Sequence, residues 1–185
     1  WQLDAQGVPS QPTDLGDFYP WDINNFGVMA GIYVTFLTDE AVRVTPAIAW
    51  FDGGSLVVEA MSTSDPLFTS PRVEALNDHP VGHPLLTIVG QTNEPNGGQA
   101  YAWKPYDPSD PVTLIGTFNG GTHSRAWDVN TSGDIVGYSE TSRDGQHAFL
   151  YKDGVLFDRN ALTDVGKTTL RWASGINDQG DIVGR

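Results

Sequence analysis

One short motif recurs four times in this chain, and this repetition constrains the fold more than any other feature of the sequence. The third copy reads NTSGDIVG (residues 130–137) and the last reads NDQGDIVG (residues 177–184). The Asn that opens each copy is Asn24, Asn77, Asn130 or Asn177, so the copies lie 53, 53 and 47 residues apart. A period near 50 residues indicates a repeat architecture, in which each repeat is one supersecondary unit.

Each repeat carries four strand signals around this motif. The first strand ends at the Asn, and the second follows a tight turn and ends at a Gly. Asn tolerates left-handed backbone and Gly adopts positive φ freely, so the four Asn are expected to occupy equivalent turns. Small and large residues alternate in the third strand, as in residues 100–103, which indicates a strand with two different faces.

The Gly that closes the second strand recurs at Gly31, Gly90, Gly137 and Gly184. A recurring Gly inside a strand indicates close approach of a neighbouring backbone. We therefore expect Gly137→Val to disrupt its repeat severely. Gly145 lies in a loop that differs between repeats, and Gly145→Ala is expected to have little effect.

Four antiparallel strands in about 50 residues are typical of a propeller blade. The sequence therefore predicts an all-β fold, either a β-propeller or a propeller segment built from four-stranded antiparallel blades. A solenoid of stacked parallel strands is the second alternative, because its period is usually shorter. The expected single repeat domain spans residues 1–185, with a leading fourth strand in 1–16, blades in 17–71, 72–116 and 117–166, and a partial blade in 167–185. The ring would be either small and imperfectly closed or one part of a longer chain.

The N-x-x-G-x-I-V-G motif and the segment HAFLY at residues 147–151 resemble the bacterial extracellular repeats of the HAF family. The resemblance covers nearly the whole chain and is best over residues 126–166. The first two repeats depart from it, because Ile48 and Tyr101 stand where the third repeat has Phe149. The resemblance implies propeller-like repeats in a secreted or surface-exposed bacterial protein. It implies no catalytic residues, because the shared motif is structural.

The charge balance of the chain excludes some partners. The formal net charge is −13, so binding to a nucleic acid or to an anionic membrane surface is not expected. The chain has no Cys, which excludes disulfides and thiol chemistry. No stretch approaches the roughly 20 apolar residues of a membrane span. The sequence opens on Trp1, and we expect that an upstream segment has been removed.

The candidate ligand-binding residues lie in the links that precede the repeated Asn. Chain direction places these links on the same face as the long and dissimilar loops between second and third strands, and varied loops on a constant scaffold are where binding is common. Aromatic rings beside polar groups can stack on sugars. The predicted ligand-binding residues are His123, Arg125, Trp127, Trp21 and Tyr19. Arg125 would favour an anionic sugar, although packing between blades is the competing explanation for the Trp residues.

Metal binding and catalysis have less support in the sequence. Residues 128–135 resemble the start of a calcium loop, but Ser139 stands where an EF-hand-like loop has Glu. A structural turn explains all four copies, so no metal and no cofactor are predicted, with calcium left as an alternative. His79 and His83 lie four residues apart in a loop whose prolines forbid a helix, which favours a decorative insertion.

The sequence therefore predicts a non-catalytic extracellular scaffold for recognition or display, with carbohydrate or another surface protein as its partner. Motifs of nucleophilic catalysis and of phosphate binding are absent. Carboxylates are abundant, which leaves a carbohydrate-active propeller enzyme, a hydrolase or lyase, as the first alternative. The second alternative is an assembly subunit whose end strands are completed by another chain, so the oligomeric state stays open.

Overall fold

A computed structural model describes residues 14–38, 41–61, 71–93, 97–109, 112–143, 145–162 and 168–185 of the chain. These residues form β1 (Phe18–Ile23), β2 (Met29–Thr38), β3 (Ala41–Asp52), β4 (Ser55–Ala60), β5 (Arg72–Leu76), β6 (Ile88–Gln91), β7 (Ala100–Trp103), β8 (Val112–Gly116), β9 (Gly120–Val129), β10 (Ile135–Thr141), β11 (Gly145–Lys152), β12 (Val155–Asp158), α1 (Arg159–Leu162), β13 (Ala173–Ile176) and β14 (Ile182–Gly184). Within these ranges, no helix is long and apolar enough to cross a membrane.

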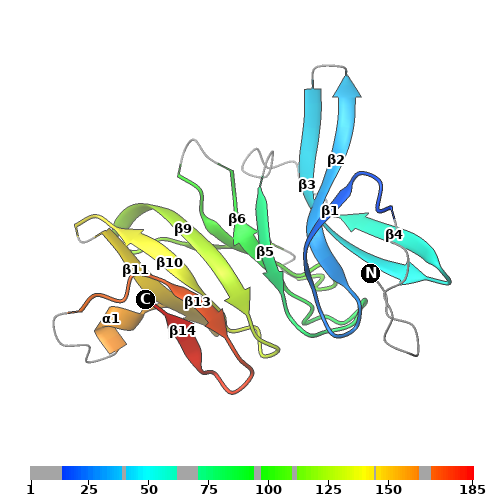
Figure 1. Ribbon diagram of the computed structural model, residues 1–185. Helices are drawn as coiled ribbons and strands as arrows, with labels where there is room; N and C mark the ends of the chain where they lie inside the picture. Colours follow the sequence, from blue (N-terminus) through cyan, green and yellow to red (C-terminus); the bar gives the residue numbers. More distant parts are fainter. Residues whose placement is uncertain are drawn as a thin grey trace.

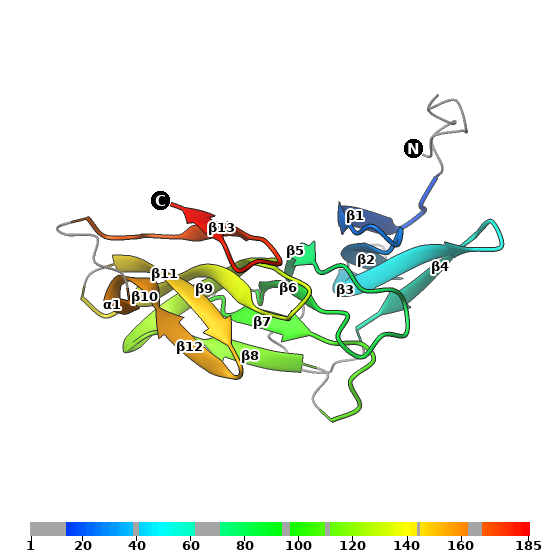
Figure 2. The ribbon, with the colours of Figure 1, turned by 90° about the horizontal axis from the view of Figure 1, so that it is seen from below.

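The strands form antiparallel sheets in chain order. Strands β1 to β4, β5 to β8 and β9 to β12 each make a four-stranded sheet, and β13 pairs with β14. The predicted all-β class with four-stranded antiparallel sheets is thereby confirmed. Neighbouring first strands contact one another, and Figure 2 shows β1, β5, β9 and β13 along one edge of the row of sheets. The expected leading strand falls mostly on residues outside the described ranges, and the described Asp14 and Leu15 belong to no strand.

The hydrophobic core lies between consecutive sheets. The first and second sheets bury one cluster together, to which Ile48 and Tyr101 contribute. Ala126 and Phe149 belong to the cluster between the second and third sheets, and Ala173 packs against the third sheet from the last one. Each repeat therefore buries its apolar surface only against its neighbours, which is the arrangement that a repeat architecture requires.

The first sheet departs from the expected alignment of third strands. Tyr101 lies opposite Gly90, and Phe149 lies opposite Gly137. In the first sheet Ala47, and not Ile48, lies opposite Gly31. The predicted equivalence of Ile48 with Phe149 is therefore wrong by one residue. Since side chains alternate across a strand, this shift turns Ile48 toward the second sheet, where it is fully buried.

The first strand of every repeat contains a β-bulge at the same position. Between β1 and β2, Pro20 lies opposite Gly31 and Asp22 lies opposite Ala30, so Trp21 is the extra residue. The equivalent extra residues in the other repeats are Glu74, Trp127 and Ser174. A bulge changes the direction of the side chain that it inserts. The spacing of the repeated residues in the sequence does not predict these bulges.

The bulge explains why a Gly closes each second strand. A Cβ at Gly137 would collide with the main-chain oxygen of Arg125 and with the ring of Phe149. The same carbonyl collision, from the residue two before the bulge, would occur at Gly31, Gly90 and Gly184. Gly145 differs from these, because it has open space around it but a φ of 84°. The prediction that Gly145→Ala has little effect needs correction, since a side chain is strained at that φ.

Candidate functional site

The four repeated Asn form a hydrogen-bonded row across the sheets. The side-chain amide of Asn24 donates to the main-chain oxygen of Asn77 at 2.9 Å, that of Asn77 donates to Asn130 at 3.3 Å, and that of Asn130 donates to Asn177 at 3.2 Å. Each side-chain oxygen accepts the N–H of the residue just before the second strand, as Asn130 does from Asp134 at 2.9 Å. The prediction of equivalent turns is confirmed, and the turns join neighbouring repeats.

A depression of about 410 Å³ opens at these turns, lined by equivalent residues of all four repeats. Its carboxylates already have donors from the preceding repeat. Asp78 accepts the main-chain N–H of Asn25 at 2.8 Å, and Asp178 accepts both the N–H and the hydroxyl of Thr131. These bonds hold the pKa of Asp178 below its ordinary value. The depression is therefore walled by groups that join the repeats to one another.

Two further carboxylates fasten one sheet to the next. Asp22 accepts the N–H of Ile23 at 2.9 Å and that of Leu76, in the next sheet, at 3.1 Å. Asp128 makes the same pair of bonds with Val129 and with Ile176. Burial raises the pKa of Asp128 above its ordinary value, against the opposing effect of these hydrogen bonds. Both carboxylates therefore have a structural role, because each bonds to main-chain groups of its own sheet and of the next sheet.

The loop predicted to resemble a calcium site has protein donors on its oxygen atoms. The carboxylate of Asp134 accepts a hydrogen bond from the amine of Lys152 at 2.6 Å. The carboxylate of Asp128 accepts the N–H of Ile176, and the side-chain oxygen of Asn130 accepts the N–H of Asp134. Among the residues that the structure describes, no three His, Cys, Asp or Glu side chains group together to hold a metal ion. The oxygen atoms of Asp128, Asn130 and Asp134 are therefore engaged by protein groups of the fold.

The insertion with His79 and His83 also joins repeats. The two imidazole rings stack in parallel with their centroids 4.1 Å apart. Nε2 of His79 lies 2.9 Å from the main-chain oxygen of Thr131, in the next repeat, and therefore carries the proton of that hydrogen bond. The expected decorative insertion thus has a role in packing.

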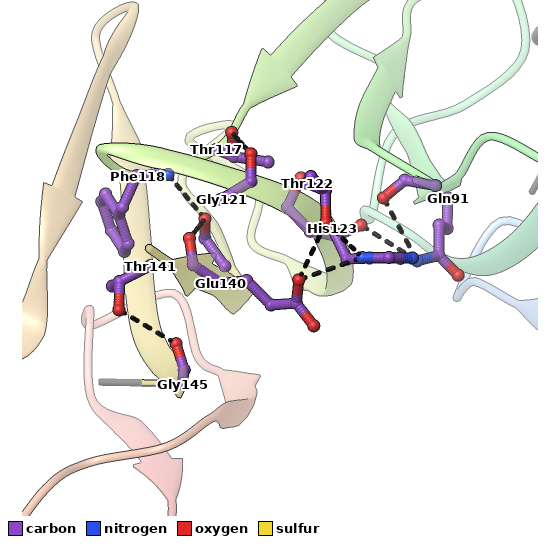
Figure 3. A network of polar contacts seen from close by, with 12 residues as sticks. Gln91, Thr117, Phe118, Gly121, Thr122, His123, Glu140, Thr141 and Gly145 are labelled. Atoms are coloured by element: carbon purple, nitrogen blue, oxygen red, sulfur yellow. Dashed lines mark hydrogen bonds and ion pairs between the residues drawn. The ribbon is translucent and has the colours of Figure 1, made fainter. Parts of the chain in front are cut away.

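Three of the five predicted ligand-binding residues lie on β9, where protein groups engage them. Nδ1 of His123 lies 3.0 Å from a carboxylate oxygen of Glu140, as Figure 3 shows. The guanidinium of Arg125 donates from Nε to Glu74 at 2.9 Å and lies 5.8 Å from the ring of Trp127. The Trp127 ring also packs against Tyr138 and Trp172. The structure therefore places Trp127 in the packing between the third sheet and the last one.

The ion pair with Glu74 changes what Arg125 is expected to do. Both side chains are largely shielded, with 26% of Arg125 and 14% of Glu74 exposed. We expect Arg125→Met to lower the free energy of unfolding by about 2 kcal/mol, because Glu74 would keep a shielded charge without a partner. Adding Glu74→Gln should restore most of that loss in thermal melts. An unchanged melting temperature in Arg125→Met would contradict this assignment.

The other two predicted residues, Tyr19 and Trp21, lie on β1, and Trp21 lines a second hollow. Tyr19 and Trp21 are 51% and 64% exposed, and Tyr19 lies opposite Ile32 of β2. The hollow measures about 270 Å³, and its lining consists of Trp21, Ile32, Val44, Pro71, Arg72, Val73 and Glu74. It lies where the first two sheets meet, and its walls are mainly aromatic and aliphatic. We call it the Trp21 pocket.

Arg72 is the cation of this pocket. It is exposed, and within the described part of the chain its guanidinium takes part in no hydrogen bond or ion pair. It stands 53 residues before Arg125, so the two arginines occupy equivalent places in successive repeats. The neighbouring Glu74 is neutralised by Arg125. Sequence reasoning singled out Arg125 and missed Arg72, although the alignment of repeats contained the signal.

The fold and this pocket define the class of the protein as a repeat protein of antiparallel β-sheets with an apolar pocket between its first two sheets. Glu74 connects the two groups of predicted residues, because it lines the Trp21 pocket and pairs with Arg125. Compared with protein-family models, with curated proteins and with solved structures, the chain has no match.

Proposed function

We propose that this protein is a non-catalytic recognition scaffold, a propeller segment that takes its ligand in the Trp21 pocket. The observation that carries the proposal is an exposed Trp21 beside Arg72, whose guanidinium has no partner among the described residues. Concave sites with apolar walls and a few polar groups are the usual form of ligand sites. The ligand is a carbohydrate or a segment of another surface protein. An extracellular or cell-surface location follows from the HAF resemblance.

The bonding of the acidic side chains supports recognition over catalysis. A glycosidase needs two carboxyl groups that face one substrate and change protonation state during the reaction. On the first strands, Asp22 and Asp128 accept two main-chain N–H groups each, and Glu74 is held by Arg125. These three carboxylates therefore stabilise the contacts between sheets. Trp21, by contrast, offers its ring to solvent, and such rings stack on sugars or on apolar side chains.

Replacing Trp21 by Ala should weaken ligand binding by about tenfold or more, because buried aromatic anchors dominate recognition energies. The measurement is binding of the purified protein to an oligosaccharide array and to a peptide array, followed by titration of each positive compound. Phe26→Ala is the matched control, since Phe26 is 60% exposed but lies in the first Asn turn. Equal losses in both variants, or no binding by the unmodified protein on either array, would refute the proposal.

A further inference from the structure

We infer that the Trp21 pocket and the adjoining face of the β2–β3 hairpin bind an extended peptide segment of a partner protein, which carries a large apolar side chain next to a carboxylate. This inference rests on the proposed recognition function and names its ligand class. The apolar side chain would enter the pocket, and the carboxylate would pair with Arg72. The shape, the free strand edges and the charge of this surface each favour such a ligand.

The hairpin extends the apolar wall of the pocket outward. Three cross-strand pairs, Ile32 with Pro46, Val34 with Val44, and Phe36 with Val42, place their side chains on one face. Ile32 and Val44 line the pocket, and Phe36 and Val42 continue the row toward the tip. Figure 1 shows this hairpin projecting beyond the neighbouring sheet.

This row of apolar side chains is open to solvent. Phe36 and Val42 are 66% and 55% exposed, and Trp21 at the foot of the row is 64% exposed. The opposite face of the hairpin is more polar, with Thr35 opposite Arg43. Contiguous exposed apolar surface on an otherwise polar protein is a mark of an interaction site. A two-sided ribbon with one apolar face is suited to lie against a partner.

The outer half of the hairpin also has free strand edges. Strand β1 pairs with β2 as far as Tyr33, and β4 pairs with β3 only from Ala47 onward. The N–H of Val34 also donates to Asp17, and Pro46 accepts the N–H of Met61. Beyond Val34 and Pro46, no described strand lies beside either edge. An extended peptide can satisfy such an edge by main-chain hydrogen bonds while its side chains fill pockets. A sugar has no main chain that can pair along a strand edge, so the free edges favour a peptide.

Charge adds the requirement for a carboxylate. Arg72 lines the pocket without a described partner, and the only other charged residue of the lining, Glu74, is paired with Arg125. The pocket therefore attracts one negative group. The whole chain has a net charge of −13, which repels a polyanion such as an acidic polysaccharide. A single carboxylate within an apolar peptide satisfies both conditions.

The test uses two variants that each remove one arginine. Arg72→Gln removes the cation of the pocket, and Arg43→Gln removes a cation from the opposite face of the same hairpin. The probes are a library of immobilised twelve-residue peptides and an array of neutral and uronate-containing oligosaccharides. We expect selected peptides in which Leu, Phe or Trp stands near Asp, Glu or a free carboxyl terminus. Arg72→Gln should weaken them about tenfold, as loss of a charge-assisted pair would, and Arg43→Gln should leave them unchanged.

A second measurement distinguishes loss of the ion pair between Arg72 and the peptide carboxylate from loss of the folded structure. When the carboxylate of a selected peptide is replaced by an amide, the difference between the unmodified protein and Arg72→Gln should vanish. Phe36→Ser should weaken every selected peptide, with its fold checked by circular dichroism. Binding of oligosaccharides alone would overturn this inference and leave the proposed function standing. Peptide binding that is equally strong in the unmodified protein and in Arg72→Gln would also overturn this inference. If neither peptides nor oligosaccharides bind, both the inference and the proposed function are refuted.

Discussion

Replacing Gly137 by Val is expected to destabilise the third sheet severely. The new side chain would meet the main-chain oxygen of Arg125, which the bulge at Trp127 brings over Gly137. Backbone cannot yield as a flexible side chain can, so we expect a loss of about 3 kcal/mol or more. For a chain of this size, that loss corresponds to roughly 10 °C in melting temperature. Thermal melts followed by circular dichroism measure it.

Gly145→Ala is the matched control for this prediction. No atom lies within 4 Å of a Cβ at Gly145, but the φ of 84° is unfavourable for Ala. We expect a loss of about 1 kcal/mol, which is the ordinary strain of left-handed backbone. If the two variants melted at the same temperature, the close approach of β9 over Gly137 would not be the reason for the recurring Gly.

Asn130→Ala is expected to cost about 2 kcal/mol, because it leaves one buried group without a partner and removes one of two hydrogen bonds from a second group. The N–H of Asp134 would lose the side-chain oxygen, and the main-chain oxygen of Asn177 would lose the amide while it keeps the N–H of Gly180. Asn130 is 4% exposed, so water replaces these bonds poorly, and unsatisfied buried groups cost about 1–3 kcal/mol each. Chemical denaturation at equilibrium gives the free energy of unfolding.

Asn177→Ala tests whether the contact between repeats is responsible. Asn177 is exposed. Among the described residues, its side chain bonds only within its own turn, to the N–H groups of Gln179 and Asp181 and to the Asp181 carboxylate. Its loss should cost about 1 kcal/mol, as for an accessible hydrogen bond. Equal losses for Asn130→Ala and Asn177→Ala would mean that the row of amides does not join the repeats.

The strands could be predicted from the sequence because Asn and Gly residues mark the turns between them. The spacing of Asn24, Asn77, Asn130 and Asn177 located every repeat, and each predicted strand that falls wholly in the described residues is present. The reason is physical, since an Asx turn and a period-two alternation are set by residues a few positions apart. The alignment failed at Ile48, where a shift of one residue in β3 leaves the composition of the strand unchanged.

Only part of the candidate site could be predicted from the sequence. Tyr19 and Trp21 were singled out because aromatic residues precede the first Asn, and of the two only Trp21 lines the Trp21 pocket. Arg125 and Trp127 have the same kind of sequence neighbourhood, yet protein groups of other repeats engage them. Arg72, which the sequence reasoning passed over, supplies the positive charge of the pocket. Its guanidinium has no partner among the described residues.

By itself, the sequence determined the repeat, its four-strand unit and the turns that join the first two strands. The tertiary structure alone decided the bulges, the register of β3, and which of two equivalent arginines is neutralised. The charge pairing depends on a group in the next sheet. The bulges and the register of β3 depend on how strands of one sheet pair, which the spacing of the repeated residues does not specify. The contact between Glu74 and Arg125 spans 51 residues, and only packing of one repeat against another brings the two side chains together.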